Sequence, residues 1–263
     1  MPALDFLVWF GSKLRTAMRN VGLTLALGYS VLRSIISVRT WRRTVRYAFV
    51  DQMHQIGVGA LPAVIGMGSL IGLVSVFQAI VWQKALGESD VIQDVLVTSM
   101  ITQVAPLLTA LIVVGRSATL MSVALGRMVS TGQLRTLDTL GIDPLDVLVI
   151  PRVLAASISC LCLTVVFVCA ALMVGYLAAI LAQVDDIPPG QFLEAVLHLL
   201  TMKDFILVLS KALLSGLVAS IVACSIGMSP QHAARGNRRL LPRSFVLGSL
   251  SILVISVLLS VLI

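Results

Sequence analysis

The residue types that carry most enzyme and metal chemistry are few in this sequence and widely separated. Its four cysteines all lie in apolar runs, at Cys160, Cys162, Cys169 and Cys224. Their spacing matches no metal or redox motif, which favours ordinary packing among apolar side chains. The histidines stand far apart, at His54, His198 and His232. Because the sequence also lacks P-loop, nucleophile-elbow, HExxH and paired-carboxylate patterns, we expect no catalytic residue and no bound metal.

Ionisable residues inside long apolar runs would indicate an ion-coupled carrier, and here the runs are nearly free of them. Lys211 is the main exception. It lies near one end of its apolar run, so an anchor whose ammonium group snorkels outward is favoured over a contact to substrate. If the chain transports anything, the energy must therefore come from another subunit.

The composition defines the class of protein that positions these side chains. Of the 263 residues, 58% are hydrophobic and only 12% are charged, and the mean hydropathy is +1.03. One crossing of the hydrocarbon takes roughly 20 apolar residues, so the chain has room for several crossings. The apolar runs are long and continuous, and lipid offers no partner to an unpaired backbone amide. We therefore predict an all-α integral membrane protein. The net charge of +7 needs no nucleic-acid partner, since anionic lipid of the inner leaflet accounts for it.

The hydropathy pattern divides the chain into two regions. Residues 1–50 are basic, with apolar residues at helical spacing. This predicts an amphipathic interfacial helix, the alternative being a solvated helix packed on a partner. Residues 51–263 are predicted to hold five transmembrane helices, at about residues 56–82, 95–116, 153–182, 205–227 and 244–263.

The distribution of charge predicts the orientation of the bundle. Lysine and arginine gather in the segments 13–46, 116–152 and 235–243, whereas the loops on the other side hold only Lys84 and Lys203. The acidic residues of those loops are Glu88, Asp90, Asp94, Asp185, Asp186 and Glu194. By the positive-inside rule, the N-terminus is cytoplasmic and the C-terminus periplasmic.

The polar segment Arg127–Pro151, between the second and third spans, predicts a short cytoplasmic helix. Its apolar face would consist of Leu134, Leu137, Leu140 and Ile142. Gly141 would end this helix, and Asp143-Pro144 would turn the chain back. A helix that projects from a bundle is a surface against which a motor domain can push. The spacing alone allows a simple connection equally well.

Several short motifs in this part of the chain resemble those of one family. They are QVAPLL around Pro106, VVGRSA with Gly115-Arg116, Gly126-Arg127-Met128, Gln133-Leu134, TLGIDPL and Pro151-Arg152, with Gln52, Ile56-Gly57, Gly72 and Gln78 upstream. The set resembles the MlaE/YrbE permeases, the membrane subunits of MCE-associated ABC lipid transporters. The resemblance covers about residues 45–260, and it favours the motor-contact interpretation of the short helix.

The sequence departs from the family pattern at a few positions. The family usually has glutamate where Gln103 stands and glycine where Ala105 stands, and it carries acids where Ala124 and Gly132 stand. Losing these acids removes contacts around the second span. We therefore expect one of two arrangements: a symmetric homodimer, or a divergent paralogue that pairs with a more typical permease.

The resemblance implies a set of partners. Two permeases would pair, as identical copies or as paralogues, each bound to a cytoplasmic ABC ATPase, with an MCE-domain protein on the periplasmic side of the inner membrane. The ATPase would use ATP and Mg, so that this chain binds no cofactor of its own. Membrane phospholipid would occupy a cavity between the permeases.

The resemblance also implies candidate site residues. The lipid cavity would be lined by Leu70, Leu73, Val76, Phe77, Gln78 and Gln103, with space left by Gly66, Gly68, Ser69, Gly72 and Ser75. Tight helix packing is the alternative role of these small residues. The coupling segment would comprise Leu134, Arg135, Leu137, Asp138, Leu140, Gly141, Asp143 and Pro144. Arg116 and Arg127 would sit at the cytoplasmic boundary. The alternative functions are an ion-coupled secondary transporter and a non-transporting membrane scaffold.

Overall fold

The computed structural model describes residues 43–86, 97–141, 143–181, 189–229 and 240–262, together with 22, 24, 26, 28–30 and 95. All regular structure among these residues is helical. Five helices are long and apolar enough to cross a membrane, namely Val45–Trp82, Val97–Ser130, Val147–Leu181, Met202–Gly227 and Pro242–Val261. The chain is therefore a multi-pass membrane protein. The predicted interfacial helix of residues 1–50 falls mostly outside the described residues.

Each of the first two spans is one helix in which α-helical segments are joined by π-helical turns. The first comprises α2 (Arg43–Met53), η2 (His54–Val58) and α3 (Gly59–Leu86). The second comprises η3 (Met100–Val104), α5 (Ala105–Val113), η4 (Val114–Ala118) and α6 (Thr119–Ser130). We expected the second span to end near Arg116, but its helix continues to Ser130. Nothing in the segment 117–130 breaks a helix, and the chain first turns at Gly132, where φ is +75°.

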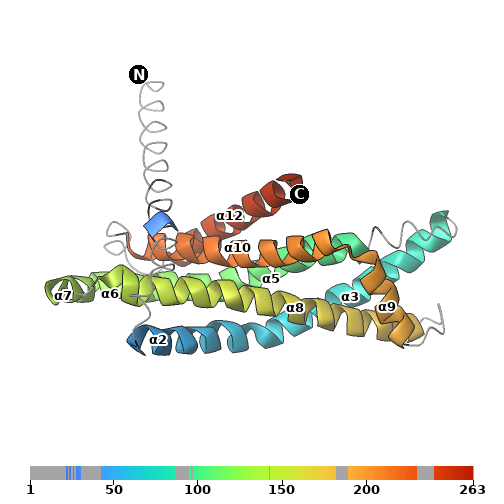
Figure 1. The fold of residues 1–263 in the computed structure, drawn as a ribbon, viewed down its shortest axis with the longest axis horizontal. Helices are drawn as coiled ribbons and strands as arrows, with labels where there is room; N and C mark the ends of the chain where they lie inside the picture. Colours follow the sequence, from blue (N-terminus) through green and yellow to red (C-terminus); the bar gives the residue numbers. More distant parts are fainter. Residues whose placement is uncertain are drawn as a thin grey trace, which may run out of the picture.

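The fourth span is the central helix of the bundle. The third span comprises η5 (Leu145–Val149) and α8 (Ile150–Leu181), the fourth is α10 (Met202–Gly227), and the fifth is α12 (Leu240–Leu262). Helix α10 contacts α5, α6, α8 and α12, whereas α3 packs mainly on α8. Figure 1 shows these helices running along the long axis, with α12 inclined to the others.

Two short helices mark opposite ends of the bundle (Figure 1). Helix α7 (Gln133–Thr139) projects at one end, and α9 (Pro189–Leu199) lies across the other. We refer to them as the α7 end and the α9 end. The α9 ring of Phe192 contacts Tyr176 of α8, with ring centroids 5.2 Å apart.

The turn after α7 is built as the sequence predicts. Gly141 adopts φ +71°, and its amide donates to the Asp138 carbonyl at 3.0 Å. The Leu145 amide then donates to Asp143 Oδ1 at 2.9 Å, at the start of the third span. A glycine in the left-handed region and an aspartate side chain together reverse the chain.

Glycines bring the long helices into close contact. Gly68 and Gly72 of α3 lie against the backbone of α8, at the carbonyls of Phe167 and Ala171. Gly216 of α10 lies in the same way against Ala156 and Cys160. Our expectation that Gly68 and Gly72 leave open space is therefore wrong, because α8 already fills that space. Gly66, in contrast, has no neighbour within 4 Å of the position that a Cβ would take.

This difference gives a paired stability test. We expect Gly72→Ala to destabilise the protein, because the new methyl group would collide with the Ala171 backbone. Overpacking of this kind costs about 1–3 kcal/mol, which corresponds to about 2–4 °C in melting temperature for each kcal/mol. Thermal unfolding in detergent measures the effect. Gly66→Ala is the matched control and should keep or slightly raise the melting temperature, because alanine favours a helix by up to about 1 kcal/mol over glycine; equal melting temperatures for the two variants would contradict the packing described above.

Candidate functional site

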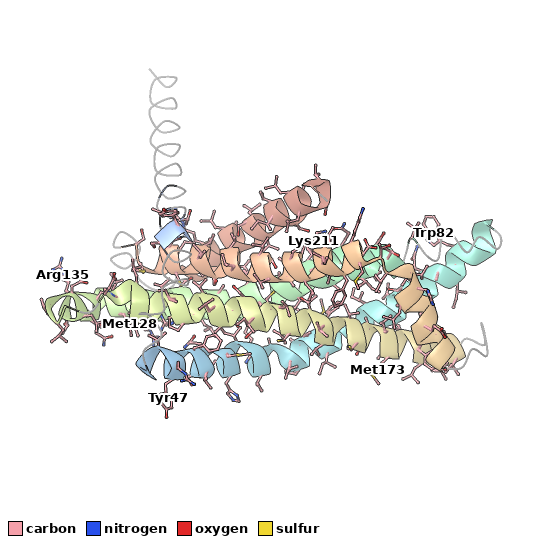
Figure 2. The ribbon with its side chains drawn as sticks, in the orientation of Figure 1. Tyr47, Trp82, Met128, Arg135, Met173 and Lys211 are labelled. Atoms are coloured by element: carbon pink, nitrogen blue, oxygen red, sulfur yellow. The ribbon has the colours of Figure 1, made fainter. Side chains whose placement is uncertain are left out.

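A polar cluster lies inside the bundle, toward its α9 end, where three spans meet. Lys211 of α10 is only 2% exposed. Its ammonium group donates to Gln103 Oε1 at 2.5 Å, to Ser260 Oγ of α12 at 2.7 Å and to the Thr102 carbonyl at 3.4 Å. Figure 2 shows Lys211 within the length of α10, away from its ends. The expectation that this lysine snorkels outward is wrong, because three acceptors hold it inside the protein.

All the acceptors of Lys211 are neutral. Gln103 Oε1 accepts hydrogen bonds from both the Lys211 ammonium group and the Ser260 hydroxyl, the latter at 3.0 Å. Within the described residues, no carboxylate bonds to the ammonium group. A buried cation is costly unless it is paired. The cluster therefore satisfies the donors of Lys211 but leaves its charge without a counter-charge.

One side of the second span is only partly buried along much of its length, with exposed residues at its two ends. Its unburied positions recur every four residues, at 103–104, 107–108, 111–112 and 115–116, while the positions between them are buried. A regular α-helix has about 3.6 residues per turn, so residues four apart drift gradually around its axis. A π turn such as η3 or η4 holds more residues per turn and so brings the repeat back onto the same side of the helix. We call these eight residues the open face: Gln103, Val104, Leu107, Leu108, Leu111, Ile112, Gly115 and Arg116.

The open face is bordered by the first and fifth spans. On one side, Ser260 of α12 bonds to Gln103, and the Phe245 ring lies 3.4 Å from the position that a Cβ on Gly115 would take. On the other side, the guanidinium of Arg116 lies against Gly59 of α3. The face thus joins a polar cluster at one end to an arginine at the other, with apolar side chains between them.

Arg116 and Arg127 lie at different depths in the bundle. They are eleven residues apart on one continuous helix, which is about 16 Å along its axis. They therefore cannot both sit at one membrane boundary. Arg127 is in the last turn of α6, whereas Arg116 belongs to η4 in the interior of the span.

The cavity residues predicted on the first span do not form one lining. Leu70, Leu73 and Phe77 are 61%, 39% and 58% exposed, and Gln78 is also exposed. Val76 instead lies against Gly175 of α8. The sixth member of the set, Gln103, bonds to residues of α10 and α12. Four of the six thus share an exposed side of α3, and Val76 is separated from them.

The predicted coupling residues are brought together at the α7 end. Leu134 and Leu137 are half-buried, and Pro144 is buried. The exposed members are Arg135, Asp138, Leu140, Gly141 and Asp143. Leu140 is 67% exposed, and Arg135 lies at the tip of the projecting helix in Figure 2. An exposed leucine on a projecting helix is suited to a contact with another chain.

Several members of the site carry no recognisable signal in the sequence. Ser260 and Thr102 joined the lysine only through folding, since α12 and η3 are remote in the chain. Arg152 of α8 was noted only as a motif residue; it is 9% exposed, and its Nη1 has no acceptor. One signal was available, because a lysine and a glutamine within apolar runs favour each other as partners in lipid.

Groups that could hold a metal are not found among the described residues. Cys160 and Cys224 are buried free thiols, and Cys162 and Cys169 are free and exposed. The candidate site therefore consists of hydrogen-bond donors, one amide and apolar surface. Such a set can bind and orient a ligand.

The chain belongs to the MlaE permease family, whose model matches residues 49–262. It is 29% identical to a probable ABC transporter permease protein of Rickettsia prowazekii, over 90% of this chain and 89% of that one. A probable ABC transporter permease protein of Synechocystis is 29% identical over 71% of this chain and 70% of its own length. The chloroplastic protein trigalactosyldiacylglycerol 1 of Arabidopsis thaliana is 26% identical over 89% of this chain and 64% of its length. The chain is thus the permease component of an ABC transporter.

The neutral acceptor at Gln103 makes a double-mutant test possible. We expect Gln103→Glu to stabilise the protein by about 1–3 kcal/mol, because a carboxylate would pair with the Lys211 ammonium group. In a Lys211→Met background the same change should destabilise, since it would leave a carboxylate unpaired. Thermal unfolding of the four proteins measures the coupling.

Gln78→Glu provides the control for this cycle, because Gln78 is exposed and makes no bond to the lysine. Its effect should be small and independent of residue 211. If Gln103→Glu shifted stability equally with and without the lysine, the cluster would carry no charge coupling.

Proposed function

We propose that this chain is the permease subunit of an ABC transporter that moves phospholipid, or a related lipid, between the inner membrane and a periplasmic MCE-domain protein. The observation that carries the proposal is the open face of the second span. It places apolar side chains between Gln103 with its bound Lys211 at one end and Arg116 at the other. A ligand that matches this face has a long apolar body and a polar or anionic group.

The family and one relative support a lipid as the cargo. The MlaE permease family covers most of the chain, and the Arabidopsis relative carries the name of a glycolipid, trigalactosyldiacylglycerol. Apolar helical surface binds acyl chains through dispersion and shape, which needs no dedicated polar site. The scarcity of charge in the spans disfavours an ion-coupled carrier.

The proposed orientation puts the α7 end in the cytoplasm and the α9 end in the periplasm. Arg46, Arg127, Arg135 and Arg152 all lie toward the α7 end, as the positive-inside rule requires of the cytoplasmic side. Exposed aromatic residues stand near both ends of the first span, Tyr47 at 70% and Trp82 at 44% exposure. Aromatic side chains are enriched at both membrane interfaces, which supports this placement.

The proposed assembly supplies what this chain lacks. A cytoplasmic ABC ATPase would use ATP and Mg, and α7 with its following turn would receive the movement of that subunit. A second permease, an identical copy or a paralogue, would cover exposed apolar surface such as that of α3. The MCE-domain protein would accept or deliver lipid at the α9 end.

The contact with the ATPase is tested at α7. We expect Leu140→Asp to weaken co-purification of the ATPase about ten-fold or more, because a buried unpaired charge costs at least 1.4 kcal/mol at such a contact. The permease should still insert and fold, since the Leu140 side chain is 67% exposed. Thr139→Asp is the matched control, with the same charge on an exposed neighbour. Full ATPase binding and ATP hydrolysis in Leu140→Asp would remove this role.

The function itself is tested with the whole complex in vesicles. Fluorescent phospholipid should move between the vesicles and the soluble MCE domain only when ATP and Mg are present. Transport driven by an ion gradient without ATP would identify a secondary transporter. A complex that holds its subunits together but neither binds nor moves lipid would be a scaffold.

A further inference from the structure

Arg116 is a cation in the interior of a span, and its guanidinium lies against a glycine of a neighbouring helix. A Cβ on Gly59 would lie 2.6 Å from Nη2 of Arg116, 3.0 Å from Cζ and 3.1 Å from Nη1. These three near-equal distances mean that the guanidinium covers the backbone of Gly59. Any other residue at position 59 would displace it.

The π turns of the first two spans meet at this contact. Gly59 follows η2 directly, and Arg116 is the central residue of η4. π-Helical turns are rare and occur often at functional sites, because they shift one side chain out of the regular helical register. Here the shift keeps Arg116 on the open face, in line with Gln103.

Arg116 lies well inside the span by comparison with the fourth helix. Helix α10 ends at Gly227, which lies against Ser122 and Leu125 of α6. Arg116 precedes those residues by six and nine positions, or about 9–13 Å along the axis. Helix α10 has 26 residues and is therefore about 39 Å long, which exceeds the hydrocarbon thickness of about 30 Å. The end of α10 thus extends beyond the hydrocarbon, and Arg116 lies inside the hydrocarbon, on the side of the α7 end.

Among the described residues, the Arg116 guanidinium has no partner that balances its charge. The side chain is exposed, and it makes neither a hydrogen bond nor an ion pair in the part of the chain that the structure describes. Arg127 and Arg135 are also exposed, but Arg127 lies in the last turn of α6 and Arg135 in the projecting helix α7. An arginine at the depth of Arg116 is expensive unless an anion or a polar group meets it.

We infer that Arg116, which lies beside Gly59, binds the phosphate of a phospholipid that is drawn below the cytoplasmic surface of the membrane. This inference rests on the proposed function. It adds a second polar binding position for the lipid, besides the cluster of Lys211 and Gln103. The planar guanidinium presents a fork of donors that suits two phosphate oxygens. Leu107, Leu108, Leu111 and Ile112 continue from it along the open face toward Lys211. An anion attached to a long apolar body fits this arrangement, which favours a phospholipid over free phosphate as the natural ligand.

The test uses the assembled transporter in lipid nanodiscs. The probe is a phosphatidylglycerol that carries a diazirine beside its phosphate, and the matched probe is a diacylglycerol with the same diazirine and no phosphate. After irradiation, mass spectrometry should locate the phosphate-bearing probe on peptides that contain Gly59 and Arg116. The diacylglycerol should label these peptides about ten-fold less, the loss expected for a charge-assisted hydrogen bond.

Single substitutions test whether the labelling depends on Arg116 itself. Arg116→Gln should reduce the labelling by phosphatidylglycerol about ten-fold. Gly59→Ala should reduce it as well, because the methyl group displaces the guanidinium. Arg46→Gln removes an exposed arginine at the α7 end, and Gly66→Ala adds a methyl group in open space. Both controls should label like the unaltered protein. Arg116→Lys, which keeps the charge, guards against loss of folding and should retain part of the labelling.

The outcomes are distinct. Equal labelling by the two probes, or full labelling of Arg116→Gln, would overturn the inference. Competition by inorganic phosphate at millimolar concentration would overturn the lipid as ligand. Loss of the second permease from Arg116→Gln, with lipid labelling intact, would assign the arginine to a protein carboxylate instead. If ATP-driven lipid transfer persists in the vesicles while the phosphate-dependent label is missing, the inference fails and the proposed function stands.

Discussion

Polar groups that enter the hydrocarbon must find their partners within the protein, and most features of this structure follow from that constraint. Backbone amides and carbonyls are paired within the long helices. Side-chain hydroxyls return to the carbonyls three or four residues earlier, as Thr109 does to Ala105 at 2.7 Å and Thr164 to Cys160 at 2.8 Å. Ser122 also bonds across to the Ala223 carbonyl at 3.0 Å and so links α6 to α10. Serine and threonine can therefore be buried here without a polar network of their own.

The same constraint explains how the helices hold together. Lipid is as apolar as leucine, so the hydrophobic effect does little to bring spans together, and close contact must supply the attraction. Gly72 against α8, Gly216 against Cys160 and Gly227 against α6 give that contact at three levels of the bundle. Between them lies a core of small and branched residues, with Phe167 as its largest fully buried side chain. The closest approach lies between α3 and α8, at Gly72, while the opposite side of α3 stays exposed and one side of the second span is only partly covered.

The three cations deepest in the spans show three solutions to the burial of charge. Lys211 is enclosed and shares three neutral acceptors. Arg152 is enclosed near the start of α8, with one nitrogen unsatisfied. Arg116 is uncovered and rests on a glycine. The difference matters for function, because an enclosed cation stabilises a particular helix arrangement, while an uncovered one is available to a ligand.

Much of the architecture was determined by the sequence alone. Apolar runs near Ile56, Val153 and Phe205 predicted helices that the structure contains, because a long apolar run in lipid has no other way to pair its backbone. Gly141 and Asp143 likewise predicted their turn from local chemistry. The contacts within the candidate site could not be predicted from the sequence. Lys211 meets Gln103 and Ser260, and Arg116 meets Gly59, only through contacts between remote segments. The π turns that keep Arg116 and Gln103 on one face leave no periodic signal in a uniformly apolar run. Which side of each helix stays uncovered was thus decided by tertiary packing, because glycine contacts between spans, and not hydropathy, fix the rotation of each helix.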